Sequence, residues 1–156
     1  MTFDSILGPG KFAAGVLTFV DHYAGDPNNT RIVVPVAFET VVTTAILDTG
    51  GPWCVLNPEE AETLALEDRP DCWEPPTPLR IRGIAYRGKL CRVATRFKAE
   101  MGAQLSVEAT VFVPLLAAHE TWRHPNFLGL DGLLSRIRFA VDPEQNHFYF
   151  GALAEH

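Results

Sequence analysis

An aspartate that follows an apolar segment is the residue best placed for chemistry. The segment 41–47 (VVTTAIL) runs directly into Asp48, Thr49 and Gly50. A buried carboxylate needs polar partners, and the N–H groups of a tight turn can provide them and fix its orientation. A carboxylate held in this way can act as an acid or a base. Asp before Gly is also a common turn sequence, so a ligand-binding β-barrel in which Asp48 only forms a turn is one alternative.

A second glycine-centred segment, 127–134 (FLGLDGLL), lies about eighty residues downstream. An expected β-hairpin at 79–97 lies between the two segments. This order of Asp-Thr-Gly, hairpin, two apolar residues and glycine resembles the retropepsin-like family of aspartic proteases. These are the single-lobe, dimeric relatives of pepsin. The resemblance covers residues 31–151.

The resemblance implies a fold and a set of site residues. The fold is all-β, an acid-protease half-barrel with one or two short helices. It forms one domain over 1–156, with its core at about 31–151 and an N-terminal strand at 12–21. The implied activity is hydrolysis of peptide bonds in a polypeptide, with no cofactor and no metal. The implied residues are the catalytic turn Asp48, Thr49 and Gly50, the supports of the catalytic loop Leu128 and Gly129, and the substrate-binding flap residues Ile84, Ala85 and Tyr86.

The chemistry of this family requires a second carboxylate. Two aspartates share one proton, so that one accepts a proton from the attacking water while the other donates to the substrate carbonyl. The chain contains a single Asp-Thr-Gly, and Asp131-Gly132 and Asp142-Pro143 supply no second turn of this kind. We therefore expect a homodimer with one Asp48 from each subunit. A non-catalytic retropepsin-like module that dimerises or binds peptides is the alternative function.

Three positions depart from the usual pattern of the family. Gly51 follows Asp-Thr-Gly, where Ala or Ser is usual. Without a hydroxyl there, the carboxylate lacks a hydrogen bond that would lower its pKa, so Gly51→Ser is expected to shift the acidic limb of activity downward. Retroviral members often pair an Asp two residues after the motif with an Arg after the downstream Gly. Pro52 and Leu130 occupy these positions, which is typical of a cellular or bacterial variant.

Other reactive side chains favour structural roles. His119 and His124 resemble a zinc-protease motif, but they are five positions apart rather than four. On a helix their side chains would diverge by about 140°, so we expect no metal site. Cys54 is expected to be a small core residue. For Tyr86, a solvent-facing position on the hairpin is the alternative to a role in the flap.

Composition excludes several function classes. The 156 residues carry a net charge of −6, and an acidic chain without a basic cluster is a poor nucleic-acid binder. No apolar run is long enough to predict a membrane span. The three cysteines have no CxxC spacing and are expected to be reduced thiols. Because 12–20 is interpreted as a strand rather than a signal sequence, we expect a cytoplasmic protein.

Capping and turn residues predict the elements that position these side chains. A helix is expected to begin after Asn57, with Pro58 in its first position and Glu60 completing a capping box, and to end near Leu66. Tyr86-Arg87-Gly88 is predicted to be the turn of the hairpin. A short helix is expected at 131–136. The predicted strands are 12–21, 31–39 (at an edge or a bulge, because of Pro35), 41–47 (buried), 53–56, 79–85, 89–97, 105–114, 137–141 and 147–151.

Overall fold

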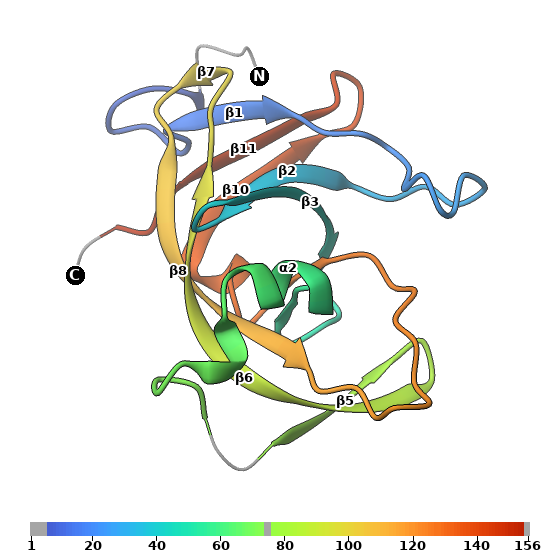
Figure 1. The fold of residues 1–156 in the computed structure, drawn as a ribbon. Coiled ribbons are helices and arrows are strands. Elements are labelled where there is room, and N and C mark those ends of the chain that lie inside the picture. Colours follow the sequence, from blue (N-terminus) through green and yellow to red (C-terminus); the bar gives the residue numbers. More distant parts are fainter. Residues whose placement is uncertain (1–5, 74–75, 155–156) are drawn as a thin grey trace.

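Two β-sheets make up most of the protein, which the computed structural model describes over residues 6–73 and 76–154 (Figure 1). The strands are β1 (Gly15–Thr18), β2 (Val33–Phe38), β3 (Val41–Asp48), β4 (Cys54–Val55), β5 (Thr77–Ile81), β6 (Ile84–Phe97), β7 (Met101–Gly102), β8 (Leu105–Pro114), β9 (Phe127–Gly129), β10 (Ile137–Asp142) and β11 (His147–Ala152). The smaller sheet has the order β10-β11-β1-β7, and the larger has the order β2-β3-β9-β4-β8-β6-β5.

The larger sheet curls into a barrel-like shape. The long strand β6 pairs with β8 from Gly88 to Phe97. Its far end also pairs with β2, at Ala37↔Arg96 and Phe38↔Thr95. Six strands therefore close on one another, while β5 and the beginning of β6 extend beyond them as a hairpin at the lower end in Figure 1. This architecture confirms the all-β prediction.

Aromatic side chains join the two sheets. Phe97 of β6 lies with its ring centroid 5.5 Å from that of Phe148 and 5.4 Å from that of Phe150, both on β11. All three are fully buried, and they belong to one hydrophobic cluster that also contains Leu128 from β9. Strand β9, which carries Leu128, therefore contributes to a core that both sheets share.

The predicted helix begins where its capping residues place it. In α2 (Pro58–Thr63) the side chain of Asn57 accepts the N–H of Glu60 at 2.9 Å. The helix ends earlier than predicted, because Ala65 adopts a left-handed conformation (φ 51°) and the chain continues as the 3-10 helix η1 (Leu66–Asp68). The predicted helix at 131–136 is reduced to a second 3-10 helix, η2 (Leu134–Arg136).

The predicted hairpin is present, but its predicted turn is wrong. The turn lies at Arg82 and Gly83, which both have positive φ, as a two-residue hairpin turn requires. Tyr86 and Gly88 instead lie within β6. A Cβ on Gly88 would collide with the carbonyl oxygen of Val113 on the neighbouring strand. Gly88 therefore permits close packing of strands, which is why its sequence signal imitates that of a turn.

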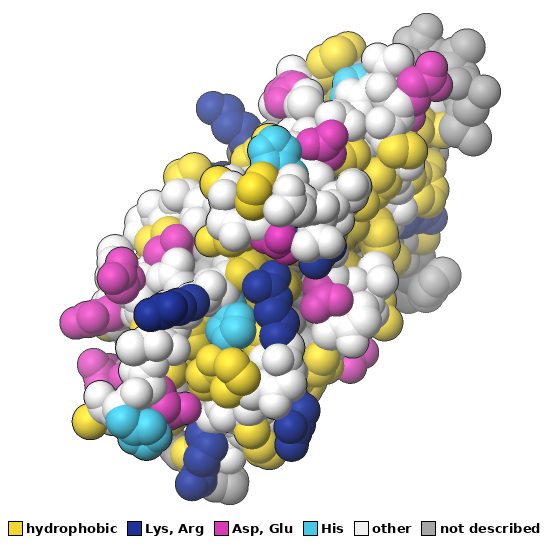
Figure 2. Space-filling view, turned by 90° about the vertical axis from the view of Figure 1, so that its right-hand side faces the viewer, with side chains coloured by type: hydrophobic (Ala, Val, Ile, Leu, Met, Phe, Trp, Pro, Cys, Tyr) yellow, Lys and Arg dark blue, Asp and Glu magenta, His cyan; other side chains and the backbone are white. Residues whose placement is uncertain are grey.

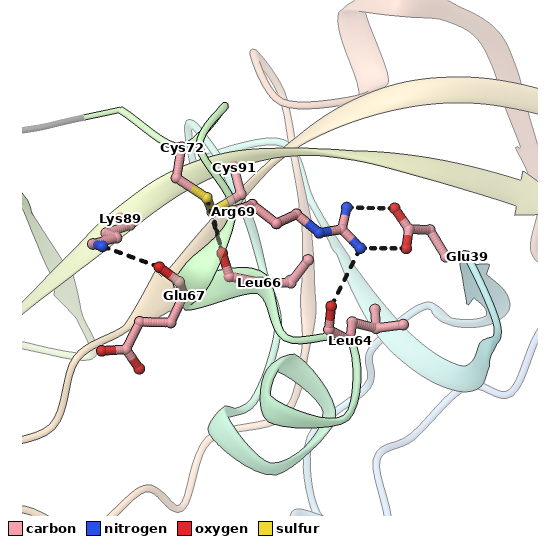
Figure 3. Close-up of a disulfide and its surroundings, with 8 residues drawn as sticks. All are labelled: Glu39, Leu64, Leu66, Glu67, Arg69, Cys72, Lys89 and Cys91. Carbon is pink, nitrogen blue, oxygen red and sulfur yellow. Dashed lines mark hydrogen bonds and ion pairs between the residues drawn. A yellow bond between two sulfur atoms is a disulfide. The ribbon is translucent and has the colours of Figure 1, made fainter.

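The prediction of three reduced thiols is also wrong. Cys72, in the loop after η1, forms a disulfide with Cys91 on β6, as Figure 3 shows. An odd number of cysteines with wide spacing does not reveal that β6 returns alongside this loop. Cys54 stays free and fully buried, as expected. Disulfides persist in oxidising compartments, so the cysteines give no support to the expectation of a cytoplasmic protein.

Two strands qualify the sequence prediction further. Pro35 lies on β2 opposite Thr44 of β3, away from the short β6 pairing, which fits the predicted edge position. The first half of β3 is not buried as predicted: its side chains alternate, and Val42 is 78 % exposed. Among the described residues, no helix has the length and apolar character needed to cross a membrane.

Candidate active site

Asp48 is the last residue of β3, and a parallel strand fixes its position. β3 pairs with β9 at Leu47↔Leu128 and Asp48↔Gly129. The two motifs that were recognised separately in the sequence are therefore hydrogen-bonded neighbours. Leu128 is fully buried, whereas Asp48 is half-buried at the sheet end, so the carboxylate leaves the core at the point where the strand stops.

The turn after β3 orients the carboxylate. The backbone N–H of Gly50 donates to Oδ1 of Asp48 at 3.1 Å, and the N–H of Gly51 donates to the Asp48 carbonyl oxygen at 3.2 Å. Thr49 and Gly50 are both exposed. The turn thus holds one carboxylate oxygen on a backbone donor and leaves Thr49 accessible to another molecule.

A cleft of about 470 Å³ lies beside Asp48. It is lined by the turn that follows β3, by Trp53 and Phe127, and by residues 79–82 of the hairpin. Leu79 and Ile81 supply apolar surface from the hairpin, while Ile46 and Val55 supply it from the barrel. The arrangement gives a cleft that is lined by a carboxylate, by apolar side chains and by one strand and the turn of a β-hairpin.

Close backbone packing supports the loop that follows Asp48. A Cβ on Gly129 would collide with the backbone of Trp53, and one on Gly132 would lie 2.6 Å from the carbonyl oxygen of Thr110. The loop after β3 and the loop after β9 are also hydrogen-bonded to each other. Leu130 N–H donates to Gly51 O at 2.7 Å, and Gly132 N–H donates to Pro52 O at 2.8 Å. Backbone bonds thus join the same two loops that a charged side-chain pair joins in retroviral members.

Gly51 has a steric role that the sequence does not reveal. A Cβ at this position would lie 2.8 Å from Oδ2 and 3.3 Å from Cγ of Asp48. Any side chain here would therefore push the carboxylate from its present position. For this reason Gly51→Ser does not test the effect of a hydroxyl alone, contrary to the expectation from the sequence.

The hairpin brings different residues to the cleft from those expected. Arg82 and the apolar residues of β5 line it, whereas Ile84, Ala85 and Tyr86 are not among its lining residues. Ile84 is 52 % exposed, next to the turn. The misplaced turn explains the difference, because it shifts the tip of the flap from Tyr86 to Arg82.

Tyr86 is buried rather than at the tip. It is 5 % exposed, and its hydroxyl lies 2.8 Å from Nε2 of His124. The Trp122 ring packs on it with a centroid distance of 4.9 Å. Burial, with a contribution from the charge of Arg82, lowers the pKa of His124. Tyr86 therefore anchors the base of the hairpin to the loop that precedes β9, and neither predicted orientation of this tyrosine is observed.

Cys54 and the histidines His119 and His124 are the other candidate residues. Burial raises the pKa of the Cys54 thiol to about 12, so this cysteine is not a nucleophile near neutral pH. Within residues 6–73 and 76–154, no three His, Cys, Asp or Glu side chains are arranged to hold a metal ion.

Asn126 is a supporting residue that the sequence did not indicate. It is 4 % exposed, and its side-chain oxygen accepts the backbone N–H of Asn57 at 2.8 Å. Its amide nitrogen lies 3.2 Å from Thr43 Oγ1, Thr44 O and Glu60 Oε2. One amide therefore links β3, the helix N-terminus and the start of β9. A polar residue before an apolar segment carries no sequence signal for such a role.

Comparison with solved structures identifies the fold of the chain. No protein-family model matches the sequence, and a comparison with curated proteins finds no match. Among solved structures, the chain is similar to a retropepsin-like aspartic protease from Rickettsia conorii, with a TM-score of 0.54 and 18 % identity over 89 % of this chain and 94 % of that one. The retroviral protease-like domain of Ddi1 from Leishmania major gives a TM-score of 0.47 and 19 % identity, over 81 % and 97 % of the two chains. The protein has a retropepsin-like fold.

Proposed function

We propose that this protein is an aspartic endopeptidase that hydrolyses polypeptides. The observation that carries the proposal is the Asp48 carboxylate, which accepts the Gly50 N–H and lines a cleft on a retropepsin-like fold. A binding module needs no carboxylate in this position, because a buried or half-buried charge is costly unless it serves a purpose. The similar protein from Rickettsia conorii is itself described as an aspartic protease, which supports the same assignment.

The active form would be a homodimer. Each chain contributes one Asp48, and water activation needs two carboxylates close enough to share a proton. The exposed Thr49 and Gly50, with Leu130 (40 % exposed) next to them in the folded chain, provide surface on which a second copy can pack. Each Thr49 would reach the turn of the opposite subunit and hold the two carboxylates in place.

Incubation with an unstructured polypeptide tests this function. The parent protein is expected to cleave it, and Asp48→Asn is expected to abolish cleavage, since an amide of the same shape cannot relay the proton. Asp131→Asn is a matched control, because Asp131 is exposed and also precedes a glycine. Retained cleavage in Asp48→Asn would refute the role of Asp48.

Sedimentation over a range of concentrations tests the dimer. Activity per chain is expected to rise with the dimer fraction, because neither subunit carries both carboxylates. A strict monomer with full proteolytic activity would overturn the shared-site mechanism. A protein that cleaves nothing over a broad pH range would favour the non-catalytic module.

A further inference from the structure

Three arginines surround the cleft of an otherwise acidic protein. Arg31 precedes β2, Arg80 lies on β5 and Arg82 forms the hairpin turn, and all three line the cleft that holds Asp48. Arg31 is about fifty residues away from the other two in the sequence, so the sequence does not show that the three meet. Asp48 is the one acidic side chain among the residues that line this cleft. The cleft therefore has a positive rim, although the chain carries a net charge of −6.

Two of these arginines have no acidic partner among the described residues. Within the described part of the chain, no carboxylate forms an ion pair with Arg80 or Arg82, and Arg80 donates only to the carbonyl oxygen of Gly83 at 3.1 Å. Arg31 lies 3.6 Å from Oδ2 of Asp26, a long contact between two partly exposed groups. By contrast, Arg69 and Glu39 form a bidentate pair elsewhere on the molecule. The guanidinium groups at the hairpin thus keep donors for a bound anion.

Apolar surface lies between these charges. Leu79 and Ile81 of β5 belong to one hydrophobic cluster with Trp53 and Phe127, and all four also line the cleft. Figure 2 shows Lys or Arg side chains standing among apolar ones on the lower part of the face that carries the hairpin end. An extended peptide in this cleft would meet apolar pockets flanked by guanidinium groups.

We propose that the cleft selects polypeptide segments in which apolar residues are flanked by aspartate or glutamate. This proposal rests on the proposed function, because it takes the groove beside Asp48 as the one that holds the polypeptide. Guanidinium groups bind carboxylates through paired, charge-assisted hydrogen bonds. Elsewhere the acidic surface repels acidic peptides, so the positive rim directs them to this cleft.

Binding to the Asp48→Asn protein tests the preference without cleavage. Three fluorescent peptides share one apolar centre and carry flanking Glu, Gln or Lys residues. The Glu peptide is expected to bind about tenfold more tightly than the Gln peptide, because two exposed charge pairs each contribute a factor of a few. The difference is expected to shrink as salt is raised from about 0.05 M to about 0.5 M, since salt screens exposed charges.

Substitutions in the same Asp48→Asn background locate the preference. Arg80→Gln together with Arg82→Gln is expected to bring the Glu and Gln peptides to nearly equal affinity. Arg96→Gln is the control. Arg96 is exposed on β6, the strand that forms the hairpin with β5, but it lies outside the cleft. A preference that survives the double substitution, or that Arg96→Gln removes equally well, would overturn the proposal.

Cleavage of the same peptides by the parent protein separates this proposal from the proposed function. Equal cleavage of all three peptides would refute the acidic preference and leave the peptidase function intact. Tighter binding of the Glu peptide with no cleavage would support the cleft preference and refute the peptidase function. Failure of all three peptides to bind would overturn both.

Discussion

Removal of the Cys72–Cys91 disulfide is expected to lower the stability of the protein substantially. The bond closes a loop with a sequence separation of 19 and fastens the segment before the hairpin to β6. In the chain-entropy description, a loop of this length contributes about 3 kcal/mol, because the cross-link restricts the unfolded chain. The hydrogen bond from Trp73 N–H to Leu90 O at 2.9 Å and the cation–π contact of Arg92 with the Trp73 ring would still hold the loop at this point. Figure 3 shows the bond next to the Arg69–Glu39 pair.

Thermal unfolding with and without a reductant measures this contribution. For a chain of this size, 1 kcal/mol corresponds to about 2–4 °C, so the Tm is expected to fall by roughly 6–12 °C on reduction. A Cys72→Ala, Cys91→Ala double variant is the control. Its Tm is expected to be low already and to be insensitive to the reductant.

Thiol counting decides whether the bond forms. Without reductant, the denatured protein is expected to expose one alkylatable thiol, that of Cys54, and with reductant three. Three thiols in the protein purified under air, or a Tm that the reductant leaves unchanged, would refute the reasoning.

Three further substitutions probe interactions that stabilise the fold or support the site. Arg69 holds the pKa of Glu39 below its usual value, so the stabilisation is complete above the unfolded pKa near 4.5 and is lost as pH falls through the lower folded value. Glu39→Gln should therefore cost about 1 kcal/mol in urea unfolding at pH 7, with the difference vanishing in acid. Asn126→Ala should cost about 1–3 kcal/mol, because it leaves the partly buried backbone N–H of Asn57 without an acceptor, and an unchanged urea midpoint would contradict this. Gly129→Ala should lower the Tm and abolish activity, since its Cβ collides with the backbone of Trp53, and a normal Tm with full activity would contradict the predicted collision.

Local patterns account for the parts of the structure that were predicted well. The apolar segment before Asp48 forms β3, and Asn57 caps α2, because strand propensity and capping depend on residues close together in the chain. The strand 105–114 is predicted with both of its boundaries. The combination of an Asp-Thr-Gly turn with the 127–134 segment indicates the retropepsin-like fold, although the two segments meet only in the folded chain.

The sequence by itself thus determined the positions of most strands, the capped helix and the carboxylate that ends β3. Only the tertiary structure decided the hairpin turn at Arg82 and Gly83, the Cys72–Cys91 disulfide, the Asn126 network and the arginines around the cleft. Glycine suits both a turn and a close contact between strands. Gly88 and Gly83 are therefore equally good candidates for the hairpin turn until the position of the strand next to Gly88 is known. Disulfide partners and converging arginines depend on which distant strands pair, and that pairing is a property of the whole sheet rather than of any local segment.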